Sequence, residues 1–115
     1  MDQARLAAKP DDPRVKAATA WVRKHYDLDS NPGMGSAGLY YYYHTFAKAL
    51  ATIGQDTFED AKGTKHNWRQ ELTAELGQRQ NPDGSWTNEN TRWFEGDPNL
   101  VTGYALLALS HCREK

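Results

Sequence analysis

The sequence predicts an all-α fold of two helical hairpins, with four main helices. Apolar residues recur at spacings of three and four along most of the chain, which is the period of an amphipathic helix. The two halves of the chain also match each other, at an offset of 50 residues before a shared turn and 61 after it. Such self-similarity is typical of stacked α/α repeats. We expect one unit over residues 1–115, with repeats at about 13–54 and 64–112 and a flexible lead-in over 1–12.

The composition limits the classes of partner. Fourteen Lys and Arg residues against fifteen Asp and Glu residues give a net charge of -1 and a pI near 6.4, which argues against a nucleic-acid or acidic-membrane binder. The single cysteine, Cys112, excludes an internal disulfide framework and a cysteine-rich zinc module. The sequence predicts no cofactor. It also shows neither a signal peptide nor a membrane-spanning run, so a cytoplasmic location is the default expectation.

The first helix is predicted from about 13 to 25. Asp12 is its expected N-cap and Pro13 its first residue, where a missing N–H costs nothing. The segment 27–35, which contains Pro and Gly, ends the helix. Its apolar face comprises Val15, Ala18, Val22 and Tyr26.

The second helix is predicted to begin after Ser36 as its N-cap and to run to Ile53, where Gly54 supplies a left-handed stop. An apolar stripe at helical spacing outweighs the strand propensity of the four successive tyrosines at 40–43. This stripe consists of Leu39, Tyr42, Tyr43, Phe46, Ala47, Leu50 and Ile53.

A polar connection over 55–64 precedes a third helix, which is predicted over 65–79 with Thr64 as its N-cap. Glu75 lies four residues before Arg79, an order that favours an ion pair. The apolar stripe is narrow, so we expect this helix to lie on the outside of the unit. The stripe consists of Trp68, Leu72 and Leu76.

The fourth helix is predicted to begin at Asp97 and Pro98 and to carry a broad apolar face over 100–109. Gly103 inside it costs about 1 kcal/mol of helix propensity, which predicts that another backbone passes close by. A long polar loop precedes the helix. The offset between the repeats grows by 11 residues in this loop because of an insertion at 89–96.

The segment 80–86, Gln-Asn-Pro-Asp-Gly-Ser-Trp, resembles the Gln-to-Trp repeat of squalene and oxidosqualene cyclases. The segment 97–109 likewise resembles the inner helix of the prenyltransferase and squalene-cyclase repeat superfamily. The resemblance covers about 13–112, and it implies an α/α toroid of which this chain is a fragment. In that family the Gln caps an outer helix and the Trp stacks against it. The resemblance therefore implies a structural role for Gln80, Asp83, Gly84 and Trp86.

A second resemblance lies in residues 31–33, Asn-Pro-Gly, and 43–45, Tyr-His-Thr, which are similar to a segment in the β subunit of protein prenyltransferases. In those enzymes the histidine is a zinc ligand, which makes His44 the one catalytic candidate. The Asp-x-Cys pair that completes the zinc site has no counterpart in this chain, so we assign no metal. The alternative is that His44 is a polar residue on the cavity side of a packed helix.

Acidic residues supply no clear proton donor. Asp27-Leu28-Asp29-Ser30 is similar to the Asp-x-Asp-Asp donor of class II terpene cyclases, with Ser30 in place of the last carboxylate. Because such a donor depends on neighbouring carboxylates, a solvated helix-exit loop is the better interpretation. We also expect Glu71 and Glu75 to lie on a solvated helix face without forming an acid–base pair.

Aromatic residues provide the candidate ligand contacts. In an α/α ring, side chains off the core stripe face the central cavity, so Tyr40, Tyr41 and His44 are the candidate cavity-lining residues. Aromatic faces there would hold an isoprenoid chain or stabilise a carbocation, and the alternative is packing against the next hairpin. Trp93 and Phe94 in the insertion either fold back onto the hairpin or rim a ligand pocket.

The resemblance thus implies a fragment of a terpenoid-cyclase-like or prenyltransferase-like protein, whose inner helices hold an isoprenoid or other apolar ligand. The chain carries an incomplete active site, so we expect no turnover from it alone. The alternative is a non-catalytic binding or scaffold module built from the same repeats. The apolar flanks of 39–53 and 100–109 predict self-association through helix faces.

Overall fold

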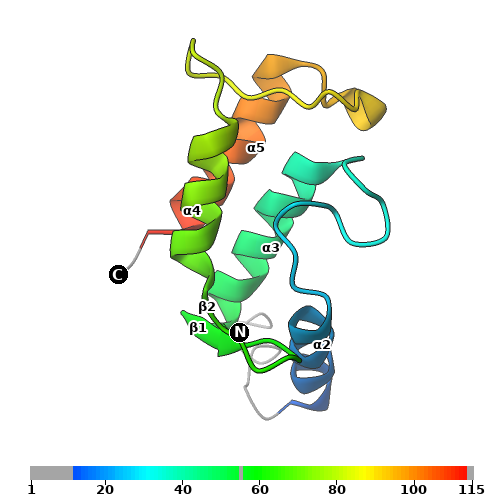
Figure 1. Ribbon diagram of the computed structural model, residues 1–115, viewed down its shortest axis with the longest axis vertical. Helices are drawn as coiled ribbons and strands as arrows, with labels where there is room; N and C mark the ends of the chain where they lie inside the picture. The colour runs from blue at the N-terminus through cyan, green and yellow to red at the C-terminus, as the bar shows by residue number, and fades with distance from the viewer. Residues whose placement is uncertain (1–11, 55, 114–115) are drawn as a thin grey trace, which may run out of the picture.

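The computed structural model describes residues 12–54 and 56–113 (Figure 1). This part of the chain is mostly helical, with four α-helices, one short 3₁₀ helix and a two-stranded antiparallel ribbon, which confirms the predicted helical class. The expected lead-in lies almost wholly outside the described residues. The elements in order are α2 (Pro13–Lys24), α3 (Leu39–Ile53), β1 (Thr57–Glu59), β2 (Lys65–Asn67), α4 (Trp68–Arg79), η1 (Arg92–Phe94) and α5 (Pro98–His111).

Three of the predicted helix ends are confirmed, and each depends on a local hydrogen bond. Asp12 Oδ1 accepts the backbone N–H of Arg14 at 2.8 Å, which caps α2. Asp97 caps α5 in the same way, through the N–H of Asn99 at 2.9 Å. Gly54 ends α3 in the left-handed region with a φ of 84°.

The start of α3 differs from the prediction. The helix begins at Leu39, and its N-cap is Gly38 with a φ of 68° and no side-chain hydrogen bond. Ser36 therefore does not cap the helix. The N–H of Leu39 donates to the carbonyl of Ser36 at 3.3 Å, and the next two N–H groups of α3 find their acceptor elsewhere in the chain.

The start of α4 also differs, because residues 65–67 form strand β2. Asp60 closes a tight turn between the strands, where its side chain accepts the N–H groups of Lys62 and Thr64 at 2.8 and 3.0 Å. The helix begins at Trp68, and Asn67 is its N-cap in place of Thr64. The two strands pair antiparallel over 57–59 and 65–67.

The apolar stripes of three helices form the core. The most extensive packing between helices in the described part is that of α3 against α5, and α4 covers this pair from one side. Helix α2 has no buried residue and lies at the end of the molecule beside the ribbon (Figure 1). Of its predicted apolar face, Ala18 is exposed. The large side chains of the core include Leu39, Tyr40, Tyr43, Phe46, Leu50, Trp68, Leu72, Leu76, Trp86 and Val101.

Gly103 is not a point of close backbone approach. A Cβ built on this glycine meets no heavy atom within 4 Å, so the prediction for this residue is wrong. Over 12–54 and 56–113, no helix combines the length and the apolar character needed to cross a bilayer.

Candidate functional site

Two turns have the same backbone hydrogen bonds at positions 50 residues apart. The N–H of Asn31 donates to the carbonyl of Gly35 at 2.7 Å, and the N–H of Asn81 donates to that of Ser85 at 2.8 Å. In each turn the N–H three residues after the asparagine returns to the asparagine carbonyl, at 2.8 and 2.9 Å. The two turns that aligned in sequence therefore have one local geometry.

The segment 80–86 joins the end of α4 to the core. Gln80 is the C-cap residue of α4, and its Nε2 donates to the carbonyl of Gly84 at 2.8 Å. Asp83 accepts both the N–H and the hydroxyl of Ser85. Trp86 is buried and donates its indole N–H to the carbonyl of Leu76 at 2.9 Å. These contacts are structural, and they fasten the turn to the helix before it.

The three cavity-lining candidates separate into two groups. Tyr40 is buried and meets Tyr43 edge to face, with ring centroids 5.6 Å apart. Tyr41 is exposed, and its ring lies 5.5 Å from that of Tyr104 on α5. The His44 ring is nearly parallel to the Tyr104 ring, with centroids 6.2 Å apart. Tyr41 and His44 thus share one face with Tyr104, whereas Tyr40 belongs to the core.

The surroundings of His44 favour its neutral form. Partial burial lowers its pKa, and the nearby His111 and Lys48 lower it further. Its Nδ1 is buried and has no hydrogen-bond partner in the described part of the chain. Across residues 12–54 and 56–113, no group of three or more His, Cys, Asp and Glu residues is placed to bind a metal ion.

The cysteine Cys112 is buried, and this burial raises the pKa of its thiol.

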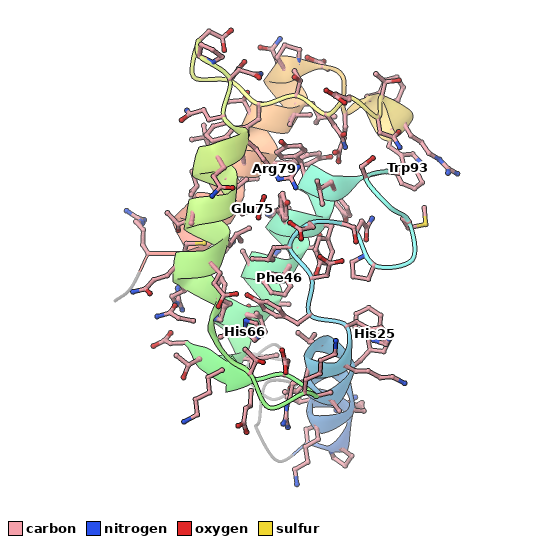
Figure 2. The ribbon with its side chains drawn as sticks, in the orientation of Figure 1. His25, Phe46, His66, Glu75, Arg79 and Trp93 are labelled. Atoms are coloured by element: carbon pink, nitrogen blue, oxygen red, sulfur yellow. The ribbon has the colours of Figure 1, made fainter. Side chains whose placement is uncertain are left out.

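The insertion places two aromatic residues at one end of the molecule. Trp93 and Phe94 have φ values of 56° and 65°, in a region that bulky residues seldom adopt. The Trp93 ring lies against Gly38, and a Cβ built on that glycine would be 2.9 Å from the ring. Figure 2 shows Trp93 beside the start of α3 and far from His66. Phe94 points outward and is 81% exposed.

A pocket of about 420 Å³ lies between this loop and the turn at 31–35. Most of the surface it offers to a ligand is apolar and aromatic. Its single ionisable carboxylate is that of Glu95, which comes from the insertion. The lining residues are Asn31, Met34, Gly38, Tyr41, Trp93, Glu95 and Tyr104.

The structure also contains a polar cluster around His66 that the sequence did not predict. His66 lies between two carboxylates, with Nε2 2.7 Å from Asp60 and Nδ1 2.9 Å from Glu71. Tyr26 stacks on the imidazole at 3.9 Å and donates its hydroxyl to Glu71 at 2.6 Å. The prediction that Glu71 lies on a solvated helix face is therefore wrong, because His66 and Tyr26 hold its half-buried carboxylate. No short motif signals this cluster, because it joins the loop after α2, the ribbon and α4.

The electrostatics of this cluster favour the charged imidazole. Burial alone would lower the pKa of His66, but the hydrogen bonds to Asp60 and Glu71 outweigh it and raise the pKa. The same contact with His66 lowers the pKa of Asp60. Glu75 instead pairs with Arg79 at 2.8 Å, as its spacing predicts.

Asp27 stabilises its own loop. Its two carboxylate oxygens accept the N–H of Asp29 at 2.7 Å and the hydroxyl of Ser30 at 2.6 Å. Asp29 is exposed. This is the arrangement of a helix-exit turn, and it does not bring the carboxylates of Asp27 and Asp29 together on a shared proton.

Comparison of the chain with models of protein families, with curated proteins and with solved structures finds no match in any of the three.

Proposed function

We propose that this chain is a binding unit for an isoprenoid or other apolar small molecule, and that the ligand occupies the pocket between the turn at 31–35 and the insertion. The observation that carries the proposal is the set of exposed apolar walls in that pocket. Trp93, Tyr41 and Met34 are 50%, 56% and 40% exposed, yet they converge on one hollow. Exposed apolar surface gathered in this way marks a binding site more often than scattered residues do.

The chemistry of the walls suits a neutral apolar ligand. The rings of Tyr41 and Tyr104 meet at 69°, so they offer one face and one edge to a bound molecule. The Met34 thioether adds a polarisable surface that adapts to irregular shapes. A ligand that covers these groups removes apolar area from water, at about 25 cal/mol per Å².

Binding is better supported than catalysis. His44 lies next to the pocket residues Tyr41 and Tyr104, but its pKa is lowered and the described residues supply no acid that pairs with it. With a lowered pKa the imidazole would act as a general base, which requires a group on the ligand that can give up a proton, and a purely apolar ligand has none. We therefore favour a binding site without catalysis and expect no turnover from the chain alone.

The two matching turns support the proposal that this chain is part of an α/α toroid. The turns at 31–35 and 81–85 share their hydrogen bonds, and each precedes a helix, α3 or α5, of the central pair. In a toroid these would be the inner helices, with α2 and α4 outside them. Further hairpins of a longer chain would then enclose the pocket.

Calorimetric titration with geraniol, a neutral isoprenoid alcohol, tests the proposal. We expect saturable binding to the wild-type chain and at least tenfold weaker binding to Trp93→Ala, which corresponds to about 1.4 kcal/mol. Trp21→Ala is the matched control, because Trp21 is 52% exposed and lies on α2. Equal loss in both variants, or no binding to the wild type, contradicts the proposal.

We also propose that the chain associates with a second copy through α5. Leu106 and Leu107 are 56% and 47% exposed on this helix, although the rest of its apolar face is largely covered. These two residues are the part of the predicted apolar flank over 100–109 that stays exposed. In a toroid, the next repeat would cover such a flank.

A further inference from the structure

Glu95 is a buried acid whose carboxylate forms hydrogen bonds with a helix far from it in the sequence. Its side chain is only 1% exposed, although it comes from the insertion before α5. Oε1 accepts the backbone N–H of Tyr40 at 3.0 Å, and Oε2 accepts that of Tyr41 at 3.0 Å. The carboxylate thus receives the first free N–H groups of α3.

These bonds replace a cap that α3 lacks. The N-terminal N–H groups of a helix have no partner within the helix, and a polar side chain at the N-cap usually accepts one of them. Gly38 holds that position in α3 and has no side chain to offer. A carboxylate is the acceptor that the positive end of the helix dipole favours, and hydrogen bonds to a charged group are the stronger kind.

Asn88 joins the two ends of the loop to each other and to the segment before α3 by hydrogen bonds. Its backbone N–H donates to the carbonyl of Glu95 at 2.8 Å. Its side-chain amide donates to Glu95 Oε1 at 3.1 Å and to the carbonyl of Ser36 at 2.6 Å. Segment 88–95 is therefore closed on itself and fastened to the residues just before α3.

The fastened segment carries backbone strain. Trp93 and Phe94 both have positive φ, a conformation that is unfavourable for bulky L-residues. Glu95 follows them directly in the chain, so its bonds to α3 fix the position of the strained pair. The same bonds place the Trp93 ring on Gly38, where no larger residue fits.

We propose that Glu95 is a positioning residue, which holds Trp93 as a wall of the apolar pocket by capping α3 from outside the helix. The part of this inference that concerns ligand affinity rests on the proposed function. The position of Trp93 in the free chain does not depend on it.

Fluorine NMR of the chain labelled with 5-fluorotryptophan tests the inference. Trp93→Phe assigns the resonance of Trp93. In Glu95→Gln we expect this resonance to move to the position it has in the unfolded chain, while those of Trp68 and Trp86, both buried in the core, stay in place. Glu89→Gln is the matched control, since it removes the same charge from an exposed site in the same loop. We expect Glu95→Gln, and not Glu89→Gln, to bind geraniol roughly tenfold more weakly.

The outcomes separate this inference from the proposed function. An unmoved Trp93 resonance in Glu95→Gln overturns the positioning role, whatever geraniol does. A moved resonance in a chain whose wild type does not bind geraniol supports the positioning role and refutes the ligand proposal. If Glu95→Gln unfolds, Glu95→Asp replaces it, because this variant keeps the charge and is too short by one methylene to reach both N–H groups. Trp93 must then move in Glu95→Asp, and a wild-type resonance there overturns the inference.

Discussion

The indole of Trp86 and the carbonyl of Leu76 form a 2.9 Å hydrogen bond between segment 80–86 and the last turns of α4. The ring itself is buried against the core. One residue therefore supplies both a polar and an apolar contact between two consecutive elements.

Replacing Trp86 with Phe removes the polar contact and part of the ring. We expect the free energy of unfolding to fall by about 1 kcal/mol for the lost hydrogen bond, with a further loss for the cavity. Urea denaturation measures the change. Trp21→Phe, at an exposed site on α2, should alter the stability by less than about 0.5 kcal/mol. Equal effects in the two variants would show that the Trp86 bond contributes nothing.

The His66 cluster predicts one pH dependence of stability. Because contacts with Asp60 and Glu71 raise the pKa of His66 above its usual 6.5, the folded chain holds the proton more tightly than the unfolded chain. This stabilisation is fully present below about pH 6.5 and is lost as the pH rises through the raised pKa. Urea denaturation from about pH 5 to about pH 8 should show wild type and His66→Gln converging in stability as the pH rises. A difference that does not change with pH contradicts the prediction.

His44 predicts the opposite pH dependence. Its pKa is lowered by burial, by His111 and by Lys48, so protonation favours the unfolded chain. The stability contributed by neutral His44 is present above about pH 6.5 and is lost as the pH falls through the lowered pKa. His44→Gln should therefore lose stability less steeply than the wild type on acidification, in the same denaturation series. A steeper loss would mean that the imidazole gains a partner when it is charged.

Gly38 and Trp93 should be coupled energetically. Gly38→Ala places a Cβ 2.9 Å from the indole at a φ of 68°, so it adds a clash to the strain of roughly 1–2 kcal/mol for a positive φ. Gly33→Ala has a φ of 83° and meets nothing within 4 Å, so it reports the strain alone. In a Trp93→Ala background, the cost of Gly38→Ala should fall to that of Gly33→Ala. If the cost stays unchanged in a double-mutant cycle, the two residues are not in contact.

Self-association through α5 should depend on Leu106. Leu106→Glu places a charge in the proposed interface, and we expect it to convert a concentration-dependent oligomer into a monomer in sedimentation velocity. Gln78→Glu adds the same charge to an exposed site on α4 and should leave association unchanged. A wild-type chain that sediments as a monomer at all concentrations would refute the proposed interface.

Sequence and structure agree on the helices because the signals that set their ends are local. Asp12 and Asp97 bond to N–H groups two residues away, and Gly54 needs only its own freedom to adopt a positive φ. The period of the apolar residues identified most of the buried residues of α3, α4 and α5, although it placed Tyr40 off the stripe of α3. The sequence did not predict the strand at 65–67. This strand forms by pairing with residues 57–59 across a turn that the side chain of Asp60 closes.

The tertiary structure alone decided the composition of the sites. Tyr40 and Tyr41 are neighbours in sequence, but the packing of α3 against α5 buries the first and leaves the second beside Tyr104. Glu95 accepts the N–H of a helical residue 54 positions before it, and the His66 cluster joins three separate segments of the chain. Helical period and capping patterns describe neighbours along the chain, whereas these contacts exist only after distant elements have packed. For that reason the sequence by itself determined most of the helices, and only the folded chain determined which polar and aromatic groups meet.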